Sequence, residues 1–539
     1  MIAGITVSLV AIPQALAYAQ LAGVPPYYGL YAAFIPTIIG ALFGSSAILS
    51  TGPVAMTSLL TAASIAPLAT AGSEQFYAYV ILLALLSGMI QIGFGLTRMG
   101  VLLNFLSHPV LMGFINAAAL IIAISQIPAL LGISIKQSQH LLIDTWHIAT
   151  NIDLLHGMSM AFGASAVVLL FAFKKFFPKF PGVLMTVVLL TWISYKTGFS
   201  EYGGRVVGDI PTGLPGLTVP SFEWAAIRDL LPVAFVIALI SFVEAMSSCK
   251  VIAMKTRTRW DENQELIGQG LAKVAAAFCQ SMPVSGSFSR SALNLDANAR
   301  TGLSSIISAG FVWATLMFFT GALYHLPKPV LAAMIIMAVA NLVNFRSIQH
   351  AWQASRDDGI AAITTFFATL LFAPNIQNGI LTGIMLSLVL FLYRRMRPRI
   401  IVTLGLHPDG TLRDAGRYDL PLLPRQICAL RFDSSLLFVN VSYFEDAVLK
   451  LIQNNPESKY ILIAGHGINH LDGSGVEIIQ SLARHLHESG ITLMFCGLKM
   501  QVLEVMQRTG LVNVIGQHNI HGTDKIAVEV LQKLALSSP

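Results

Sequence analysis

The stretch SMPVSGSFSRSALN (281–294) interrupts an otherwise apolar part of the chain with small polar residues and one arginine. An arginine at membrane depth is costly, so it usually faces a polar cavity or a partner. Pro283 and Gly286 disfavour a continuous helix here, and Ser287 and Ser289 suit the cap of a helix that begins just afterwards. The pattern predicts an extended segment leading into a half-helix. Its free N–H groups and positive dipole end beside Arg290 would form an anion site. The alternative is a re-entrant loop with a structural arginine.

A similar stretch, GSSAILSTGPVAMTSLL (44–60), lies in the first half of the chain. Ser50 and Thr51 could cap a helix, and Pro53 suits a first helical position. Two half-helix N-termini that face each other would hold an anion from both sides. A chance Gly-Pro turn is the alternative.

Glu244 is the only acidic residue between Asp229 and Asp261, and it lies in a long apolar run. Burial penalises the charged form of a carboxylate, which makes Glu244 a candidate proton carrier. A basic neighbour such as Arg290 would act oppositely and hold it ionised. A purely structural Glu–Arg clamp between helices is the alternative.

Gln14 and Tyr18 are four residues apart in the first apolar segment and therefore share a helix face. Pro13 is expected to kink that helix. The two side chains could line a polar site, although a glutamine in a membrane helix often only bonds a neighbouring helix.

Composition places the chain among polytopic membrane proteins. Only 11% of its 539 residues are charged, and the mean hydropathy is +0.69. Residues 1–399 hold 22 Lys/Arg against 14 Asp/Glu, whereas residues 400–539 hold 11 against 13. The basic excess thus belongs to the membrane part and does not indicate nucleic-acid binding.

Enzymatic chemistry is not indicated. The four cysteines show no CxxC spacing, and there is no P-loop, dinucleotide fingerprint or Ser-His-Asp pattern. His466 and His470 are four residues apart, but the run is glycine-containing and lacks further ligands for a metal. We therefore expect no enzyme activity, no cofactor and no metal.

Apolar segments long enough to span or to enter a membrane occur on both sides of a Gly/Pro-rich loop at 208–220. Short interrupted segments in matching places of two halves are typical of transporters with inverted repeats. Basic loops alternate with acidic ones and place both termini in the cytoplasm. The expected segments are 3–22, 28–44, 54–69, 76–97, 109–131, 157–177 and 182–198, then 230–254, 264–280, 288–296, 302–325, 328–343, 359–375 and 377–393.

A small α/β domain follows the membrane part, because strand-like and helical patterns alternate there. The expected strands are 427–432, 436–441, 459–465 and 492–497. The expected helices are 444–455, 475–489 and 500–510.

Five motifs in a fixed order resemble the SulP/SLC26 family of anion transporters (sulfate permeases). Four lie in the membrane part, and the last resembles the signature of the STAS domain that follows it in that family. The motifs are PPYYGLYAAF (25–34), STGPVAM (50–56), ISFVEAMSSCKVIA (240–253), PVSGSFSRSALN (283–294) and HLDGSGVE (470–477).

The resemblance implies a polytopic α-helical membrane protein, a 7+7 inverted repeat of about fourteen transmembrane segments with core and gate domains, followed by a soluble α/β STAS domain. The transporter domain would comprise residues 1–399, with repeats 1–207 and 221–399, and the cytoplasmic STAS domain residues 420–539. Family members are typically homodimers whose core moves like an elevator. They usually carry a cytoplasmic segment before the IAGITV sequence, so the resemblance implies either a chain truncated ahead of Met1 or a misplaced start.

The resemblance also implies roles for particular residues. Glu244 would couple transport to protons, as in the sulfate members of plants and bacteria, and Ser474 matches a position that is phosphorylated in some STAS proteins. We expect Ser474 to act first as a helix cap. The implied substrate-binding residues are Gln14, Tyr18, Thr51, Pro53, Val54, Ala55, Phe288, Ser289 and Arg290.

Together these patterns predict a secondary active transporter in the cell membrane, most simply a proton-coupled sulfate symporter. A bicarbonate, chloride or dicarboxylate transporter of the same fold is the first alternative. A membrane-anchored signalling or scaffold protein that acts through its STAS domain is the second.

Overall fold

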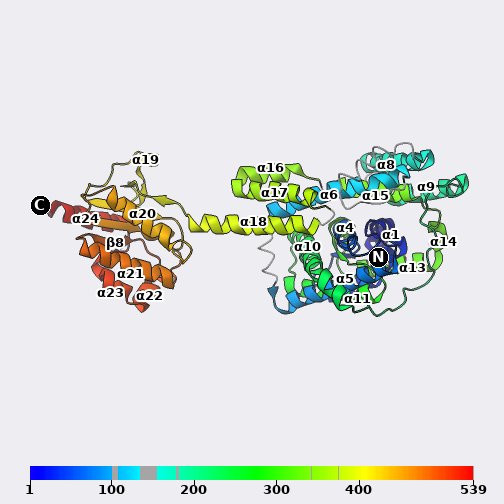
Figure 1. Cartoon of the computed structure of the whole chain (residues 1–539), viewed down its shortest axis with the longest axis horizontal. Coiled ribbons are helices and arrows are strands. Elements are labelled where there is room, and N and C mark those ends of the chain that lie inside the picture. Colours follow the sequence, from blue (N-terminus) through cyan, green and yellow to red (C-terminus); the bar gives the residue numbers. More distant parts are fainter. Residues whose placement is uncertain (100–106, 134–154, 178–180, 341–342, 374–375, 538–539) are drawn as a thin grey trace. The chain divides into compact units, whose positions relative to one another are not determined.

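The computed structural model describes residues 1–99, 107–133, 155–177, 181–340, 343–373 and 376–537 of the chain. Two compact units are present, Met1–Ser387 and Leu388–Pro539 (Figure 1).

The first unit is helical. Among the described residues, eight helices are long and apolar enough to cross a membrane. The expected total of about fourteen segments stays a prediction. The helices are α1 (Ile2–Leu21), α2 (Pro26–Ala32), α3 (Ile35–Phe43), α4 (Ala55–Ile65), α5 (Glu74–Leu96), α6 (His108–Leu131), α8 (Gly157–Phe176), α9 (Gly182–Thr197), α10 (Trp224–Thr256), α11 (Glu262–Phe278), α12 (Phe288–Asp296), α13 (Leu303–Phe318), α14 (Thr320–Leu323), α15 (Lys328–Ala340), α16 (Phe345–Ala354), α17 (Arg356–Leu371) and α18 (Ile376–Met396).

Most expected segments end within a few residues of an observed helix, but three details differ. The segment 28–44 is divided into α2 and α3, because Pro36 in the first turn of α3 favours a new helix start there. The segment 302–325 is divided into α13 and α14. The amphipathic helix α16 was not expected, because only Ala351 of it is buried and its sequence lacks an apolar span.

Two groups of helices make up this unit. Helices α1 to α5 pack with α10 to α13, and α6, α8 and α9 pack with α15 to α17. The second group forms a separate layer beside the first in Figure 1. Helix α1 contacts α9 and α15, so it lies where the two groups meet.

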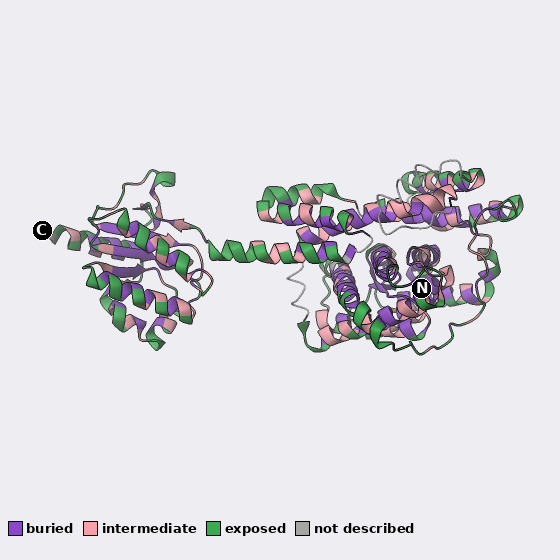
Figure 2. Cartoon of the chain, viewed as in Figure 1, coloured by how far each residue is buried: buried purple, intermediate pink, exposed green. Residues whose placement is uncertain are grey.

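The second unit contains a five-stranded sheet in the order β3-β6-β7-β8-β9, in which β6 to β9 are parallel and β3 is antiparallel to β6. The purple strands in Figure 2 show that the sheet is the buried layer. The strands are β3 (Ile400–Ile401), β4 (Leu404–Leu406), β5 (Leu412–Asp414), β6 (Ile427–Phe432), β7 (Tyr460–Ala464), β8 (Thr492–Cys496) and β9 (Ile520–His521).

Helices cover both faces of this sheet. Residues of α20 to α23 share one apolar cluster with the sheet, and residues of α24 share another with β4 and β5. The helices are α19 (Ala415–Tyr418), α20 (Val441–Gln453), α21 (Gly473–Glu488), α22 (Met500–Arg508), α23 (Leu511–Ile515) and α24 (Asp524–Ser537), with 3-10 turns at Gly465–Gly467 and Gln517–Asn519.

The expected strand at 436–441 is wrong. Leu436 forms only an isolated bridge with Leu471. The Asn440 side chain accepts a hydrogen bond from the Leu437 amide at 2.9 Å and donates one to the Ser435 carbonyl at 3.0 Å. These local bonds favour a turn that leads into α20.

His466, after β7, is joined to Asp524, the first residue of α24, by a 2.7 Å contact. The hydrogen bond to Asp524 raises the pKa of His466. Burial raises the pKa of Asp524, but hydrogen bonds from His466 and the Leu412 amide outweigh this and lower it overall. The pair therefore stabilises the unit most between the unfolded-state pKa of the carboxyl and that of the imidazole, about 4 to 6.5.

We expect the free energy of unfolding of this unit to fall as the pH rises above about 6.5, through the raised pKa of His466, and to fall again in acid as Asp524 is protonated. Because the imidazole is half exposed, the effect should stay below about 1 kcal/mol. Urea unfolding of residues 388–539, followed by circular dichroism, measures it. His466→Gln should remove the alkaline loss, whereas His470→Gln at an exposed position should keep it; equal pH profiles for wild type and His466→Gln would contradict the assignment.

Candidate functional site

Two short strands bring the two polar stretches together. Strand β1 (Ser50–Gly52) pairs antiparallel with β2 (Ser285–Ser287). Each strand leads into a short helix, α4 after β1 and α12 after β2, so two half-helix units meet at the strand pair. Gly286 is needed there, because a Cβ atom at this position would lie 2.9 Å from the Cβ of Ala245 on α10. The predicted extended segment and half-helix at 281–294 are confirmed.

The cap predictions are partly correct. Ser287 is the N-cap of α12, and its side chain accepts a hydrogen bond from the Arg290 amide at 3.4 Å, whereas Ser289 lies inside the first turn. Ser50 and Thr51 do not cap α4, because strand pairing keeps them extended and Val54 takes the N-cap position. Pro53 therefore precedes the helix instead of starting it.

Arg290 is the centre of this arrangement. It is buried, with 2% of its surface exposed. Its Nη1 donates to the Pro53 carbonyl oxygen at 2.9 Å, and its Nε donates to Ser50 Oγ at 3.4 Å. Its Nη2 is buried and has no hydrogen-bond partner among the described residues. The guanidinium, which belongs to the β2–α12 unit, is thus held by the β1–α4 unit and retains unused donor capacity.

Gly52 lies directly against this guanidinium, because an added Cβ would sit 2.9 Å from Arg290 Nη2. We expect Gly52→Ala to displace the guanidinium and weaken anion binding by about tenfold, since binding groups must keep their geometry closely. Gly310→Ala on α13 is the matched control, because nothing lies within 4 Å of its Cβ position. Isothermal titration of both purified variants with sulfate measures the effect; equal dissociation constants would contradict it.

Glu244 lies on α10, which packs against β2 and α12. The residue is partly buried, and its Oε2 atom is buried without a hydrogen-bond partner among the described residues. It interacts electrostatically with Arg290, but the two form no salt bridge among the described side chains. A direct Glu–Arg clamp is therefore absent from this conformation.

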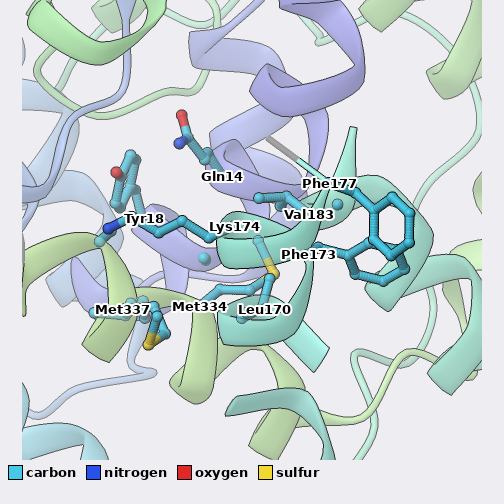
Figure 3. A pocket seen from close by; sticks show the side chains of 13 residues that line it. Gln14, Tyr18, Leu170, Phe173, Lys174, Phe177, Val183, Met334 and Met337 are labelled. Carbon is cyan, nitrogen blue, oxygen red and sulfur yellow. The ribbon is translucent and has the colours of Figure 1, made fainter. Parts of the chain in front are cut away.

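A cavity of about 230 Å³ lies between α1 of the first helix group and α8, α9 and α15 of the second. Gln14 and Tyr18 line it together, as their spacing predicted. In Figure 3 the Lys174 side chain reaches from α8 toward Tyr18. Tyr18 also interacts electrostatically with Arg290 and Glu244, so it connects the cavity with the half-helix units.

The other predicted binding residues do not line this cavity. Thr51, Val54 and Ala55 are buried around the start of α4, while Phe288 and Ser289 are exposed in the first turn of α12. The structure thus brings Thr51 to Ala55 and Arg290 together at the strand pair, and Gln14 and Tyr18 together at the cavity.

Helix α11 carries polar residues that the sequence analysis missed. Glu265 accepts hydrogen bonds from the Ser45 and Ser46 amides, both at 2.8 Å. Gln269 donates to Thr51 Oγ1 at 2.7 Å, so α11 supports the loop before β1 and the strand itself. Lys273 is fully buried on the same helix. Charged residues within a span were the available signal.

Ser474 lies at the start of α21 in the second unit, where it is partly buried. It is not the helix cap, because the Asp472 side chain takes that role and accepts a hydrogen bond from the Gly475 amide at 2.9 Å. A regulatory role for Ser474 stays a prediction.

Comparison with known proteins gives consistent matches along the chain. Residues 1–365 match the sulfate permease family, and residues 423–526 match the STAS domain. Sulfate transporter 4.1, chloroplastic, of Arabidopsis thaliana is 33% identical over 99% of this chain and 80% of its own length. A probable sulfate transporter of Mycobacterium tuberculosis is 29% identical over 99% of this chain and 95% of its own. The solved structure of SLC26A9 covers 99% of this chain and 90% of its own with a TM-score of 0.91 at 20% identity, which shows a shared fold.

Proposed function

Because the chain belongs to the sulfate permease family, which consists of transporters and not of enzymes, we propose that it is a proton-coupled sulfate symporter. Anion transport follows from the family. Sulfate as the substrate is supported by the names of its relatives, and coupling to protons is supported by the site. The observation that carries the proposal is the buried Arg290, fixed between two half-helices, with one donor nitrogen that no described residue pairs.

The anion binds where α4 and α12 begin. Helix N-termini present free N–H groups and a positive dipole end, and an arginine adds a full charge with a planar donor set suited to oxyanions. Arg290, Ser289 and Phe288 approach the anion from α12, and Thr51, Pro53, Val54 and Ala55 from the segment entering α4. Gln14 and Tyr18 contribute from α1, where the 230 Å³ cavity supplies a path for the anion.

Glu244 carries the coupled proton. Its buried Oε2 has no hydrogen-bond partner in the described part of the chain, and the neighbouring Ser285 hydroxyl donates its single proton to the Ser241 carbonyl oxygen at 3.0 Å. With its proton on Ser241, that hydroxyl has lone pairs that can accept a hydrogen bond from a protonated Glu244. Protonation removes a negative charge close to Arg290 and so favours anion binding.

Transport proceeds by an elevator-type movement. The group containing α1, α4, α10 and α12 forms the core that carries the anion, and the group containing α8, α9 and α15 forms the gate. The position of the cavity between them supports this division.

The remaining assignments follow the sequence patterns and the family resemblance. The transporter domain comprises residues 1–399, with repeats 1–207 and 221–399, and the STAS domain residues 420–539. The protein lies in the cell membrane as a homodimer, with both termini and the STAS domain in the cytoplasm.

Uptake of labelled sulfate, bicarbonate, chloride and a dicarboxylate by purified protein in liposomes tests the proposal. We expect sulfate to enter fastest and the other anions to compete weakly. Preferred uptake of another anion would instead favour that transporter of the same fold. Absence of all uptake, together with partner binding that Ser474→Asp abolishes, would favour a signalling role.

A further inference from the structure

Lys273 on α11 is a fully buried lysine inside the membrane part. Its ammonium donates hydrogen bonds to Gln91 Oε1 on α5 and to Ser241 Oγ on α10. Both acceptors are neutral, so neither cancels the charge of the lysine. Burying an ammonium group without a directly bonded carboxylate is costly, and such residues in membrane segments usually serve a function.

Few charged groups surround this ammonium. Glu244, one turn beyond Ser241 on α10, interacts with it electrostatically, and Glu244 also interacts electrostatically with Arg290. Glu265, earlier on the same helix, is engaged by the amides of the loop before β1. Helix α3 carries no charged residue, and α5 carries only Glu74 at its distant start.

Lys273 is also coupled to the strand that opens the second half-helix. Ser241 receives the lysine's hydrogen bond on its hydroxyl, and its carbonyl receives the bond from Ser285 at the start of β2. Residues Ser285 and Gly52 are direct partners in the strand pair. Two hydrogen bonds through Ser241 therefore link the ammonium to Ser285. Ser285 pairs with Gly52, which lies against the Arg290 guanidinium.

We propose that Lys273 is a second cation of the anion site and sets its preference for a divalent over a monovalent anion. This inference rests on the proposed function. With Glu244 protonated, Arg290 and Lys273 give the site two positive charges, which match the two negative charges of sulfate. With Glu244 ionised, the site retains one positive charge and holds a divalent anion poorly. One proton taken up by Glu244 thus completes the charge match.

The size of the effect follows from electrostatics. At an effective dielectric of about 20 and a separation of about 10 Å, one cation strengthens binding roughly tenfold for each unit of anion charge. Loss of the Lys273 charge should therefore weaken the binding of sulfate about 100-fold and the binding of chloride about tenfold. The sulfate-to-chloride selectivity should fall about tenfold.

Two variants remove this charge in different ways. Lys273→Gln keeps a polar side chain that can bond Gln91 and Ser241, and Gln91→Glu leaves the lysine in place but pairs it with a carboxylate of the same shape as the amide. Gln91→Met is the matched control, because it removes the hydrogen bond and keeps the charge. For each purified protein, the dissociation constant of sulfate and the competition constant of chloride are measured by titration at acidic pH.

We expect Lys273→Gln and Gln91→Glu to lose the divalent preference and Gln91→Met to keep it. If Lys273 were only a structural link between α5, α10 and α11, Gln91→Glu would strengthen that link and leave selectivity unchanged, which would overturn the proposal. Should Lys273→Gln fail to fold, Gln91→Glu alone decides. Wild-type protein that binds no sulfate would refute the proposed function instead, so the two failures are distinguishable.

Discussion

Arg290→Ala should weaken sulfate binding at least about thirtyfold, because removing one member of a buried, hydrogen-bonded charge interaction costs about 2–5 kcal/mol. Among the described side chains, only Arg290 joins the start of α12 to the segment before α4 by a charged hydrogen bond, through the Pro53 carbonyl. The variant removes the cation and leaves the anion with helix N-termini alone, each of which contributes less than about 2 kcal/mol.

Arg300→Ala is the matched control, because this arginine is exposed just beyond the end of α12. Isothermal titration with sulfate compares the two variants with the wild type. Arg290→Lys adds a second test, since it keeps the charge but loses the planar donor set; its affinity should lie between those of the wild type and Arg290→Ala. An unchanged dissociation constant for Arg290→Ala would remove this residue from the site.

Glu244→Gln should abolish the stimulation of sulfate uptake by an inward proton gradient, because glutamine resembles the protonated acid and cannot release the proton. Exchange of sulfate across the membrane should continue, since the neutral side chain leaves the positive charge of the site intact. Proton-driven uptake measures coupling, whereas exchange without a proton gradient measures binding and translocation. Comparing the two assays therefore separates a coupling defect from a binding defect.

Asp229→Asn on the same helix is the control for Glu244→Gln. Asp229 is exposed and paired with Arg228 at 3.2 Å, so its neutralisation should leave proton stimulation intact. Proton-driven uptake that persists in Glu244→Gln would show that another group carries the proton.

Local sequence signals predicted the half-helix site in part. The extended segment, the start of α12 and the Ser287 cap follow from proline, glycine and serine at fixed spacings, because these residues act within a few positions of themselves. The α4 cap was wrong for a long-range reason. Strand β1 is extended because it pairs with β2, which is more than 200 residues away, and no local pattern reports such a partner.

The polar residues of α11 were missed for a related reason. Lys273 and Gln269 lie in a helix whose polar residues are visible in the sequence, but their significance comes from partners on other elements, such as Gln91 and Thr51. In the second unit the strand expected at 436–441 was wrong for a local reason. Its apolar residues suggested a strand, but the Asn440 side chain bonds Leu437 and Ser435 and forms a turn. Apolar patterns predict which residues are buried more reliably than they predict their partners.

Accumulation of labelled sulfate by purified protein in liposomes, with and without an imposed inward proton gradient, tests the central proposal most directly. The site of Arg290 and Glu244 predicts that sulfate rises above its external concentration when the outside is acidic, and only equilibrates when the gradient is absent. Equal uptake under both conditions would contradict proton coupling, and no sulfate uptake under either would contradict the assignment of the site.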